Sequence, residues 1–456
     1  MARPLCFVLM PFGRKPDPTG GEPIDFDRVY DTAIRQALDA AGLDAIRADE
    51  ERTGGIIHKA MFERLLLCDY AIADLTCANA NVFYELGVRH AVRPATTQVI
   101  FGKGHVPPFD VNYVRGMAYD LGANNVFSTD HAAALRDALS KRLRDLREQA
   151  TGGSVTDSPL FQLLTDYGAP DIKRLKTDTF RDRVEYAAQT KASLASARDK
   201  KDIATLVAIE AGLGELDAVE TGVLVDLYLS YRALSAWNRM VELHARLPKA
   251  LQHTVLVREQ LGFALNRLGQ RQDALRVLEE VENEQGANSE TSGLIGRVYK
   301  DLWVEAKQSG NTALAAGHLR SAVVAYERGF QSDFRDAYPG INAATLLDIQ
   351  GTPKAEGRKR EILPVVRFAV QRRLASGKAD YWDRATLLEI AVLDADAEAA
   401  GDALADALSA QREQWEGEST ANNLMLIREA RLARGCSEPW LDDIIRALDK
   451  KRLPAT

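Results

Sequence analysis

The stretch IADLTCANANVFYELGVRH, residues 72–90, decides the fold of the N-terminal part of the chain. It begins as an apolar strand, passes through a short polar loop and continues with helical periodicity. Asp74 stands near the end of the strand, and Glu85 stands one helical turn after Asn81. A strand that runs into a helix in this way is half of a βαβ unit, so the stretch predicts a parallel sheet.

The same alternation continues on both sides of this stretch. Apolar strands are expected at residues 5–10, 44–49, 70–75, 97–102 and 116–121, and helices at 26–42, 56–68, 80–92 and 131–149. Right-handed crossovers between such strands give a doubly wound, flavodoxin-like α/β domain, predicted to span residues 1–148. The small, polar segment 149–158 is typical of a linker.

Residues 159–456 show helical patterns without a convincing strand. The segment LGFALNRLGQRQDALRVLEEV, residues 261–281, has the residue types and spacing of the tetratricopeptide pattern, whose period is about 34 residues. Gly296 follows Gly262 by 34 residues, and the unit that contains Gly296 has a longer first helix than the consensus. Stacked repeats form an α-solenoid with a concave binding face, so the chain is expected to be α/β plus all-α. After about residue 355 the pattern fades into unassigned helices.

The composition favours an ordinary soluble protein, with 46% hydrophobic and 27% charged residues. The net charge of −7 disfavours a nucleic-acid partner. No apolar run is long enough to span a membrane, and the N-terminal run ends in Pro-Phe-Gly, which favours a strand over a signal peptide. The four cysteines lack CxxC spacing, which favours a reducing cytoplasm, and no His and Cys cluster predicts a metal site.

Ligands of open parallel sheets bind outside the carboxyl ends of the strands. The residues expected at that edge follow the first three strands: Pro11, Phe12, Gly13, Arg14, Asp49, Asp74, Asn79, Asn81, Tyr84 and Glu85. A carboxylate there can stabilise or attack the anomeric carbon while an N-glycosidic bond breaks. The structural alternatives are that Glu85 is a solvated or capping acid, that Asp74 shapes a turn, that Asn79 or Asn81 is an N-cap, and that Tyr84 belongs to the core.

The segments LMPFG, AGLDAIRADE and IADLT…YELGVRHA together resemble the nucleoside 2-deoxyribosyltransferase-like group, which is related to TIR domains. The resemblance covers roughly residues 4–145. It implies that Glu85 is the nucleophile or charge stabiliser and that Asp74 contacts the sugar. It also implies an N-glycosidase (nucleosidase or NAD glycohydrolase) or a deoxyribosyltransferase that needs no separate cofactor, with NAD or another nucleotide as substrate or ligand. The long loop at residues 11–26 departs from the group, so the substrate stays open.

A second resemblance lies in YERGFQSDFRDAYPGINAATLL, residues 326–347. This segment is similar to the helical regulatory region of the apoptosis-signal-regulating kinases, which is often named for TRAF binding. Its most specific part is Tyr-Pro-Gly-Ile-Asn-Ala at 338–343. The chain has no kinase Gly-rich loop or HRD segment, so it resembles the sensor half without the kinase, an arrangement expected in a bacterial stress or defence system.

Three functions follow from these features. The first is an N-glycosidase-like effector whose helical half senses a partner and controls the activity. The alternative is a non-catalytic module that binds a nucleotide-like signal and passes it on through a protein-interaction solenoid. The third is a scaffold with a degenerate sheet domain, and the retained Asp74 and Glu85 argue against it. The expected partners are a nucleotide-like small molecule and a protein or second copy of the chain bound by the repeats, with homo-oligomers expected by analogy alone.

Overall fold

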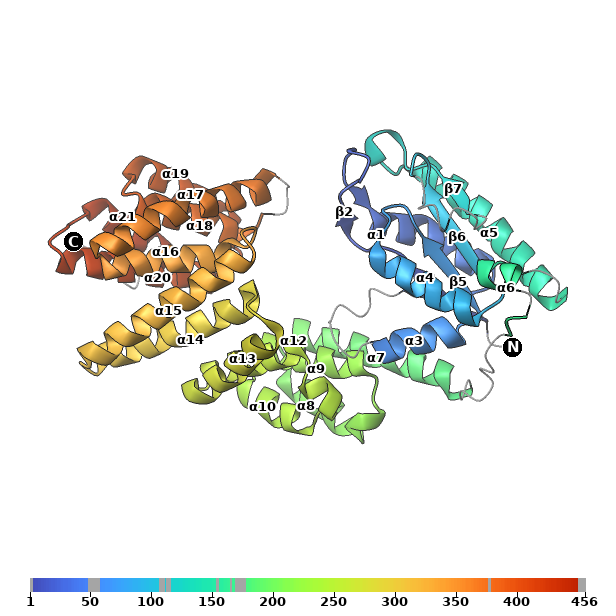
Figure 1. Cartoon of the computed structure of the whole chain (residues 1–456), viewed down its shortest axis with the longest axis horizontal. Coiled ribbons are helices and arrows are strands. Elements are labelled where there is room, and N and C mark those ends of the chain that lie inside the picture. The colour runs from blue at the N-terminus through green and yellow to red at the C-terminus, as the bar shows by residue number, and fades with distance from the viewer. Residues whose placement is uncertain are drawn as a thin grey trace. The chain divides into compact units, whose positions relative to one another are not determined.

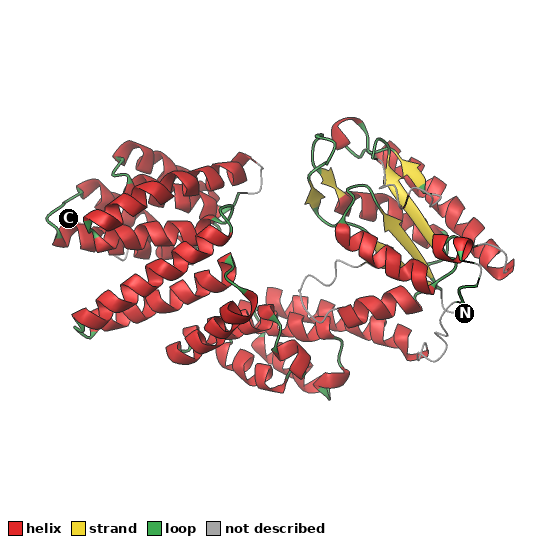
Figure 2. Cartoon of the chain, viewed as in Figure 1, coloured by secondary structure: helices red, strands yellow, loops and turns green. Residues whose placement is uncertain are grey.

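The computed structural model describes residues 3–47, 58–105, 111, 116–152, 156–164, 166–168, 178–375 and 379–449. The chain divides into two compact units, Met1–Ser230 and Tyr231–Thr456. All described strands lie in the first unit, and the described part of the second unit is helical (Figure 2). An α/β part followed by an all-helical part agrees with the fold class predicted from the sequence.

The sheet contains five parallel strands (Figure 1). They are β1 (Leu5–Leu9), β4 (Asp44–Arg47), β5 (Tyr70–Asp74), β6 (Thr97–Gly102) and β7 (Met117–Tyr119), in the order β4-β1-β5-β6-β7. Val8 of β1 pairs with Arg47 on one side and with Ile72 on the other. This is the flavodoxin-like strand order, in which the direction of winding reverses between β1 and β5. The predicted parallel sheet is therefore confirmed.

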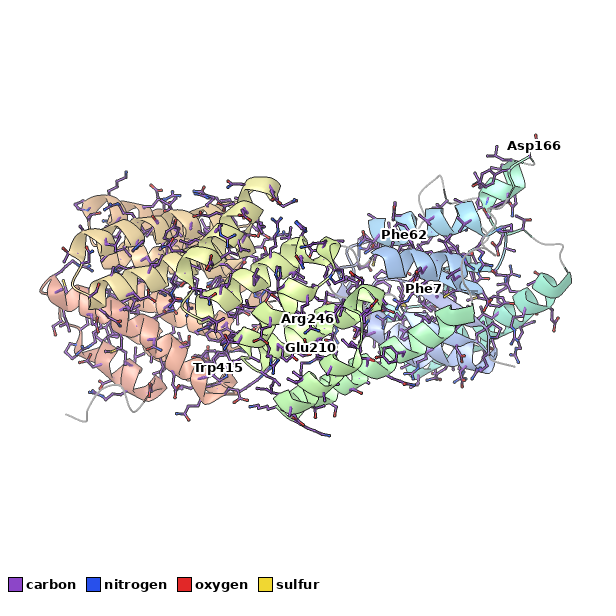
Figure 3. The ribbon with its side chains drawn as sticks, turned by 90° about the horizontal axis from the view of Figure 1, so that it is seen from below. Phe7, Phe62, Asp166, Glu210, Arg246 and Trp415 are labelled. Atoms are coloured by element: carbon purple, nitrogen blue, oxygen red, sulfur yellow. The ribbon has the colours of Figure 1, made fainter. Side chains whose placement is uncertain are left out.

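Helices cover both faces of the sheet. One face is covered by α1 (Phe26–Val29), α2 (Arg35–Ala40) and α5 (Thr129–Gly152), and the other by α3 (His58–Leu67) and α4 (Ala80–Val92). Along β1, Cys6 and Val8 face the first layer while Phe7 and Leu9 face the second, as the two-residue period of a strand requires. Phe7 is fully buried within the sheet domain (Figure 3). The predicted helix at 26–42 is interrupted by a π-helical turn, Tyr30–Ile34, which the sequence analysis did not predict.

The segment predicted as a linker is partly helical and partly packed. Helix α5 continues to Gly152, past the predicted boundary at 148. The Thr97 backbone N–H donates to Asp157 Oδ2 at 2.8 Å, and Ser158 Oγ donates to the His90 carbonyl at 2.8 Å. These bonds fix the end of the segment to β6 and α4. The first unit then continues through α6 (Pro159–Leu163), α7 (Asp178–Asp199), α8 (Ile203–Gly212) and most of α9 (Thr221–Ala233). Independent folding of residues 1–148 stays a prediction.

The second unit is a series of antiparallel helix pairs joined by short loops (Figure 1). Its helices are α10 (Trp237–Arg246), α11 (Lys249–Gln252), α12 (Val255–Arg267), α13 (Arg271–Gln285), α14 (Ser289–Gln308), α15 (Thr312–Ser332), α16 (Ala337–Gln350), α17 (Pro353–Ala375), α18 (Tyr381–Leu393), α19 (Ala397–Ala410), α20 (Gln414–Ala433) and α21 (Pro439–Leu448). The helices after residue 355, which the sequence left unassigned, continue the same pairing.

Glycines mark the closest helix contacts of these pairs. A Cβ added to Gly262 of α12 would lie 2.5 Å from the Leu278 side chain on α13, and one added to Gly296 of α14 would lie 2.7 Å from the Tyr326 ring on α15. Such distances leave room only for glycine. The repeat register predicted from the spacing of Gly262 and Gly296 is therefore confirmed. Gly340 of α16 makes the same kind of contact with Val366 of α17, although it lies 44 rather than 34 residues after Gly296.

Candidate functional site

The first candidate site is the sheet edge, which we define as the loops after β1, β5, β6 and β7. Asp74 ends β5 and is completely buried. Its Oδ1 accepts hydrogen bonds from the Thr76 backbone N–H at 3.0 Å and from the Thr76 hydroxyl, and its Oδ2 accepts one from the Tyr119 hydroxyl at 2.8 Å. Burial raises the pKa of the Asp74 carboxyl above its ordinary value. In this structure Asp74 therefore orders the loop after β5.

Asn79 and Asn81 lie where α4 begins. The Asn79 side chain accepts from the backbone N–H groups of Asn81 at 2.9 Å and Val82 at 3.3 Å, so it is the N-cap of the helix. Asn81 itself is exposed. One turn further, Glu85 is half-buried, and Tyr84 is 57% exposed, with its ring in a T-shaped contact with the Phe62 ring. The sequence predicted Tyr84 as a ligand-binding residue, and its exposure leaves the ring accessible.

The residues after β1 form a small hairpin, in which β2 (Arg14–Lys15) pairs with β3 (Ile24–Asp25). Pro11 is buried, and Phe12 is partly exposed beneath the Lys15 ammonium group. The Gly13 N–H donates to Asp27 Oδ1 at 3.0 Å, and the Arg14 guanidinium pairs with Asp25 at 3.2 Å. The remaining predicted residue, Asp49, lies outside the described residues.

Other polar residues of the sheet edge were not predicted from the sequence. Asp17, in the hairpin loop, accepts a hydrogen bond from Asn125 Nδ2 at 2.8 Å and lies 3.8 Å from His105 Nε2. Thr76 Oγ1 also accepts from the Gly102 N–H at 2.9 Å. These contacts join the chain at the ends of four strands, because Asp17 follows β1, Thr76 follows β5, Gly102 and His105 lie at the end of β6, and Asn125 follows β7. The Asp-Leu-Thr sequence at 74–76 could have predicted the role of Thr76, since an Asp side chain often accepts a hydrogen bond from the residue two positions later in a local turn.

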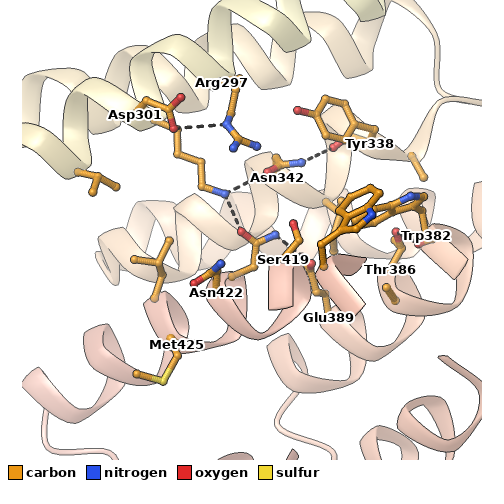
Figure 4. A pocket seen from close by; sticks show the side chains of 18 of the residues that line it. Arg297, Asp301, Tyr338, Asn342, Trp382, Thr386, Glu389, Ser419, Asn422 and Met425 are labelled. Carbon is orange, nitrogen blue, oxygen red and sulfur yellow. Dashed lines mark hydrogen bonds and ion pairs between the residues drawn. The ribbon is translucent and has the colours of Figure 1, made fainter. Parts of the chain in front are cut away.

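The second candidate site is a groove in the helical unit, which we define as the cavity of about 1090 Å³ lined mainly by α12, α14, α16, α18 and α20. Each of these is the first helix of a pair. The cavity walls carry side chains that lie far apart in the sequence. Figure 4 shows Arg297 and Asp301 on one wall, Trp382 and Thr386 on the other, and Asn342 between them.

The floor of the groove is a buried polar network centred on Lys300, which is only 6% exposed. Lys300 Nζ donates to Asn423 Oδ1 at 2.9 Å and to Asn342 Oδ1 at 3.3 Å. Asn423 Nδ2 in turn donates to Glu389 Oε1 at 3.1 Å (Figure 4). Burial lowers the pKa of Lys300 to about 8 and raises the pKa of Glu389. The network joins α14, α16, α18 and α20, and it therefore fixes the shape of the floor.

One end of the groove is rich in arginine. The guanidinium groups of Arg232, near the end of α9, and Arg267 lie 5.0 and 5.1 Å from the centre of the Phe263 ring. Arg297 lies nearby on α14 and pairs with Asp301 at 3.3 Å. Arg232 and Arg267 are exposed. Among the described residues neither makes an ion pair with a carboxylate, so both have donors available for a ligand.

Two tryptophans form another part of the groove wall. The rings of Trp382 on α18 and Trp415 on α20 lie 5.7 Å apart at an angle of 41°, and the residues are 40% and 56% exposed. The chain contains five tryptophans, so two on one wall of one cavity are a notable share. Periodicity could not find them, because 33 residues and a complete helix separate them.

Within the described ranges, no group of three or more His, Cys, Asp or Glu side chains could hold a metal ion. Among the same residues, no helix combines the length and the apolar character needed to cross a membrane.

Comparison with solved structures finds weak likeness to helical repeat proteins. A thermophilic tetratricopeptide repeat protein from Thermus thermophilus aligns with a TM-score of 0.34 and 16% identity, over 44% of this chain and 97% of that one. A tetratricopeptide repeat protein from Parabacteroides merdae aligns with a TM-score of 0.33 and 12% identity, over 59% of this chain and 99% of that one.

Curated relatives come from animal kinases. The mitogen-activated protein kinase kinase kinase nsy-1 of Caenorhabditis elegans is 29% identical over 219 residues, which are 44% of this chain and 14% of the kinase. Mitogen-activated protein kinase kinase kinase 15 of Mus musculus is 26% identical over 264 residues, which are 54% of this chain and 19% of the kinase. The aligned parts thus span less than a fifth of these relatives.

These relatives bear out the resemblance to the kinase regulatory region. The resemblance of residues 4–145 to nucleoside 2-deoxyribosyltransferases gains no support from them and stays a prediction. The family model described as the MAP3K TRAFs-binding domain matches residues 82–443, from α4 of the sheet domain to α21. The match covers well over half of the chain, which therefore belongs to the MAP3K TRAFs-binding domain family.

Proposed function

We propose that the chain is a protein-interaction module whose groove binds an extended segment of a partner protein. The observation that carries the proposal is the open cavity of about 1090 Å³, which has exposed arginines and tryptophans on its walls. Exposed aromatic and arginine side chains in a concave surface are the residues that most often dominate protein interfaces. Membership of a family named for TRAF binding supports the same conclusion.

The size of the groove favours a peptide segment over a small molecule. Its volume of about 1090 Å³ exceeds the range of about 300–1000 Å³ that is usual for small-molecule sites. Helices α14 and α20 contact each other directly, because Lys300 Nζ donates to Asn423 Oδ1 at 2.9 Å and Lys307 pairs with Glu429 at 2.8 Å. The first helices therefore enclose the cavity instead of lying in a single row.

The experiment is a selection from a display library of random twelve-residue peptides on the full-length protein. Selected peptides are then tested against Asn422→Trp, which adds bulk at an exposed residue that lines the groove. Gln272→Trp is the matched control, because Gln272 is also exposed, on α13, but does not line the groove. We expect Asn422→Trp to weaken binding at least about tenfold, a loss of about 1.4 kcal/mol. Equal binding by both variants contradicts the proposal.

A second candidate function concerns the sheet edge. We propose that it binds a nucleotide-like molecule and that Glu85 acts on its N-glycosidic bond, with the helical unit controlling the site in response to the partner. The supporting observation is the strand order, which reverses between β1 and β5, since ligands of open α/β sheets bind where the winding reverses. Complete burial of Asp74 supports a positioning role for it rather than contact with a sugar.

The test is incubation of the full-length protein with nucleosides, nucleotides and NAD, followed by chromatography of the released base. The carboxylate of Glu85 is needed opposite an oxocarbenium-like centre, so Glu85→Gln should abolish release while leaving the circular dichroism spectrum unchanged. Undiminished release by Glu85→Gln removes Glu85 from the mechanism. If the wild-type protein neither releases base nor binds these compounds in calorimetry, this second function is wrong.

A further inference from the structure

We infer that the segment bound in the groove is acidic and carries an aromatic or long apolar side chain. The acidic residues lie against Arg232 and Arg267, and the apolar side chain lies against Trp382 and Trp415. This inference rests on the proposed function, because it names the chemistry of the segment that the groove binds.

The charges of the groove favour an anionic ligand once their existing partners are considered. The lining contains six cations and six carboxylates, so its formal charge is zero: Arg232, Arg267, Arg297, Lys300, Lys307 and Arg373 against Asp301, Asp336, Asp380, Asp383, Glu389 and Glu429. Each of these carboxylates already has a partner within the protein, whereas Arg232 and Arg267 form no ion pair among the described residues. The formal charge of the lining stays zero, but these two arginines keep guanidinium donors that an anionic group can use.

The acids are engaged in two ways. Three of them form ion pairs: Asp301 with Arg297 at 3.3 Å, Asp383 with Arg373 at 2.6 Å, and Glu429 with Lys307 at 2.8 Å. The other three accept hydrogen bonds: Asp336 caps α16, Asp380 caps α18, and Glu389 accepts from Asn423 and Thr345. An acid that caps a helix N-terminus is also stabilised by the helix dipole. A basic ligand would have to replace these partners, whereas an acidic ligand would not.

Arg267 is the best-placed anion contact. It is exposed on the wall and held over the Phe263 ring, with Arg232 against the same ring. The stacked arrangement limits the freedom of both guanidinium groups without using their hydrogen-bond donors, because a cation–π contact involves the face of the group. Arg232 donates one bond, to Gln260 Oε1 at 2.7 Å. Planar guanidinium groups with free donors suit the bidentate binding of carboxylates.

The two tryptophans are the reason why we expect an apolar side chain in the bound segment. Their exposed fractions of 40% and 56% leave a large part of each ring in contact with water. The rings are tilted by 41° rather than stacked, so they form an angled surface against which one side chain can pack. Burial of apolar surface contributes about 25 cal/mol per Å², which makes an aromatic or leucine side chain the favoured occupant.

The composition of peptides selected on the full-length protein gives the first test. We expect enrichment of Asp and Glu together with one Trp, Phe, Tyr or Leu, and binding that weakens as the salt concentration rises. Selected peptides that are basic or uncharged, but are blocked by Asn422→Trp, would contradict this inference while leaving the proposed function intact. Peptides unaffected by Asn422→Trp, or an absence of any enriched peptide, would contradict both.

The second test measures affinity for one selected peptide by fluorescence anisotropy. Arg267→Ala removes a charge-assisted contact, so we expect about tenfold weaker binding, which is equivalent to about 1.4 kcal/mol. Arg276→Ala on α13 is the matched control, because that arginine is exposed, pairs with Asp273 and lies outside the groove lining. Replacing the acidic residues of the peptide by Asn or Gln should reduce the effect of Arg267→Ala to less than about twofold. An effect that stays tenfold with the neutral peptide contradicts the contact.

Discussion

The sheet edge and the groove both contain a buried ionisable group, but they use it differently. Asp74 is enclosed by Thr76 and Tyr119, whose hydroxyls occupy its carboxylate oxygens. Lys300 is almost as deeply buried, yet it lies beneath an open cavity whose walls carry exposed arginines and tryptophans. Buried charge in the first region therefore stabilises a loop, whereas in the second it shapes the floor of a binding surface. Burial alone does not identify a functional residue; the open space beside it does.

The largest effect is expected from Asp74→Ala, which tests the closed half of this comparison. The substitution leaves the Thr76 N–H without its acceptor and leaves the Thr76 and Tyr119 hydroxyls only each other as partners, at 3.1 Å, which should cost about 3 kcal/mol. Hydrogen exchange of the β5 and β6 amides would report the loss. The exposed Asp31→Ala is the control and should change exchange little. Unchanged protection in Asp74→Ala would mean that Asp74 does not hold the loop, and would make a role in ligand binding more attractive.

The next effect concerns the glycine contacts that position the groove helices. Gly296→Ala places a methyl group against the Tyr326 ring and should lower the unfolding free energy by about 2 kcal/mol. Gly317→Ala, in α15, meets nothing within 4 Å and should raise it by about 0.5 kcal/mol, because alanine favours the helix. Urea unfolding of the two variants checks the opposite signs. Stabilisation by both would show that α14 and α15 are not in close contact at Gly296.

The third effect is a pH dependence caused by Lys300. Its pKa is lowered from 10.5 to about 8 in the folded chain, so between these values the unfolded state binds more protons and the folded state gains stability as the pH rises. The Lys300→Met variant has no ionisable amine at this position, so its unfolding free energy does not rise with pH for this reason. The wild-type unfolding free energy should therefore rise relative to that of Lys300→Met by about 1.5 kcal/mol from about pH 8 to about pH 9.5. A constant difference over this interval would show that the Lys300 pKa is close to its ordinary value.

The smallest effect on stability is expected from Trp415→Ala, because the residue is 56% exposed. The unfolding free energy should change by less than about 0.5 kcal/mol, as is usual at exposed positions. Affinity for a selected peptide should nevertheless fall several-fold, since the ring provides apolar contact area. Calorimetric unfolding and anisotropy measure the two quantities. A large loss of stability without a loss of affinity would assign Trp415 to the folded core instead of the binding surface.

The features predicted correctly are those that local sequence determines. The strand at 70–75 and the helix at 80–92 follow from apolar patterning, and the α12–α13 pair follows from Gly262, Ala274 and Leu278 at tetratricopeptide spacing. Periodicity records which face of an element is buried, and this was sufficient for the order of elements. Asp74 was predicted at the correct edge, but its enclosure depends on Tyr119, 45 residues away.

The groove could not be predicted for the same reason. Lys300 contacts Asn423 across 123 residues of sequence, and Arg232 and Arg267 share one ring although they lie on different helices. No local period connects such residues. They come together only because successive helix pairs stack, and the stacking interval varies from 34 residues to 44. The Tyr-Pro-Gly-Ile-Asn-Ala segment did point to this region, since Tyr338 and Asn342 line the groove.

The most direct measurement of the central claim is photo-crosslinking of a selected peptide that carries a benzophenone side chain in place of its apolar residue. The full-length protein is irradiated with the peptide, digested and analysed by mass spectrometry. We expect crosslinks to α18 and α20 near Trp382 and Trp415, which Asn422→Trp suppresses and Gln272→Trp does not. Crosslinks confined to the second helices of the pairs, α13, α15 and α17, or to residues 3–230, would contradict the claim that the groove is the binding surface.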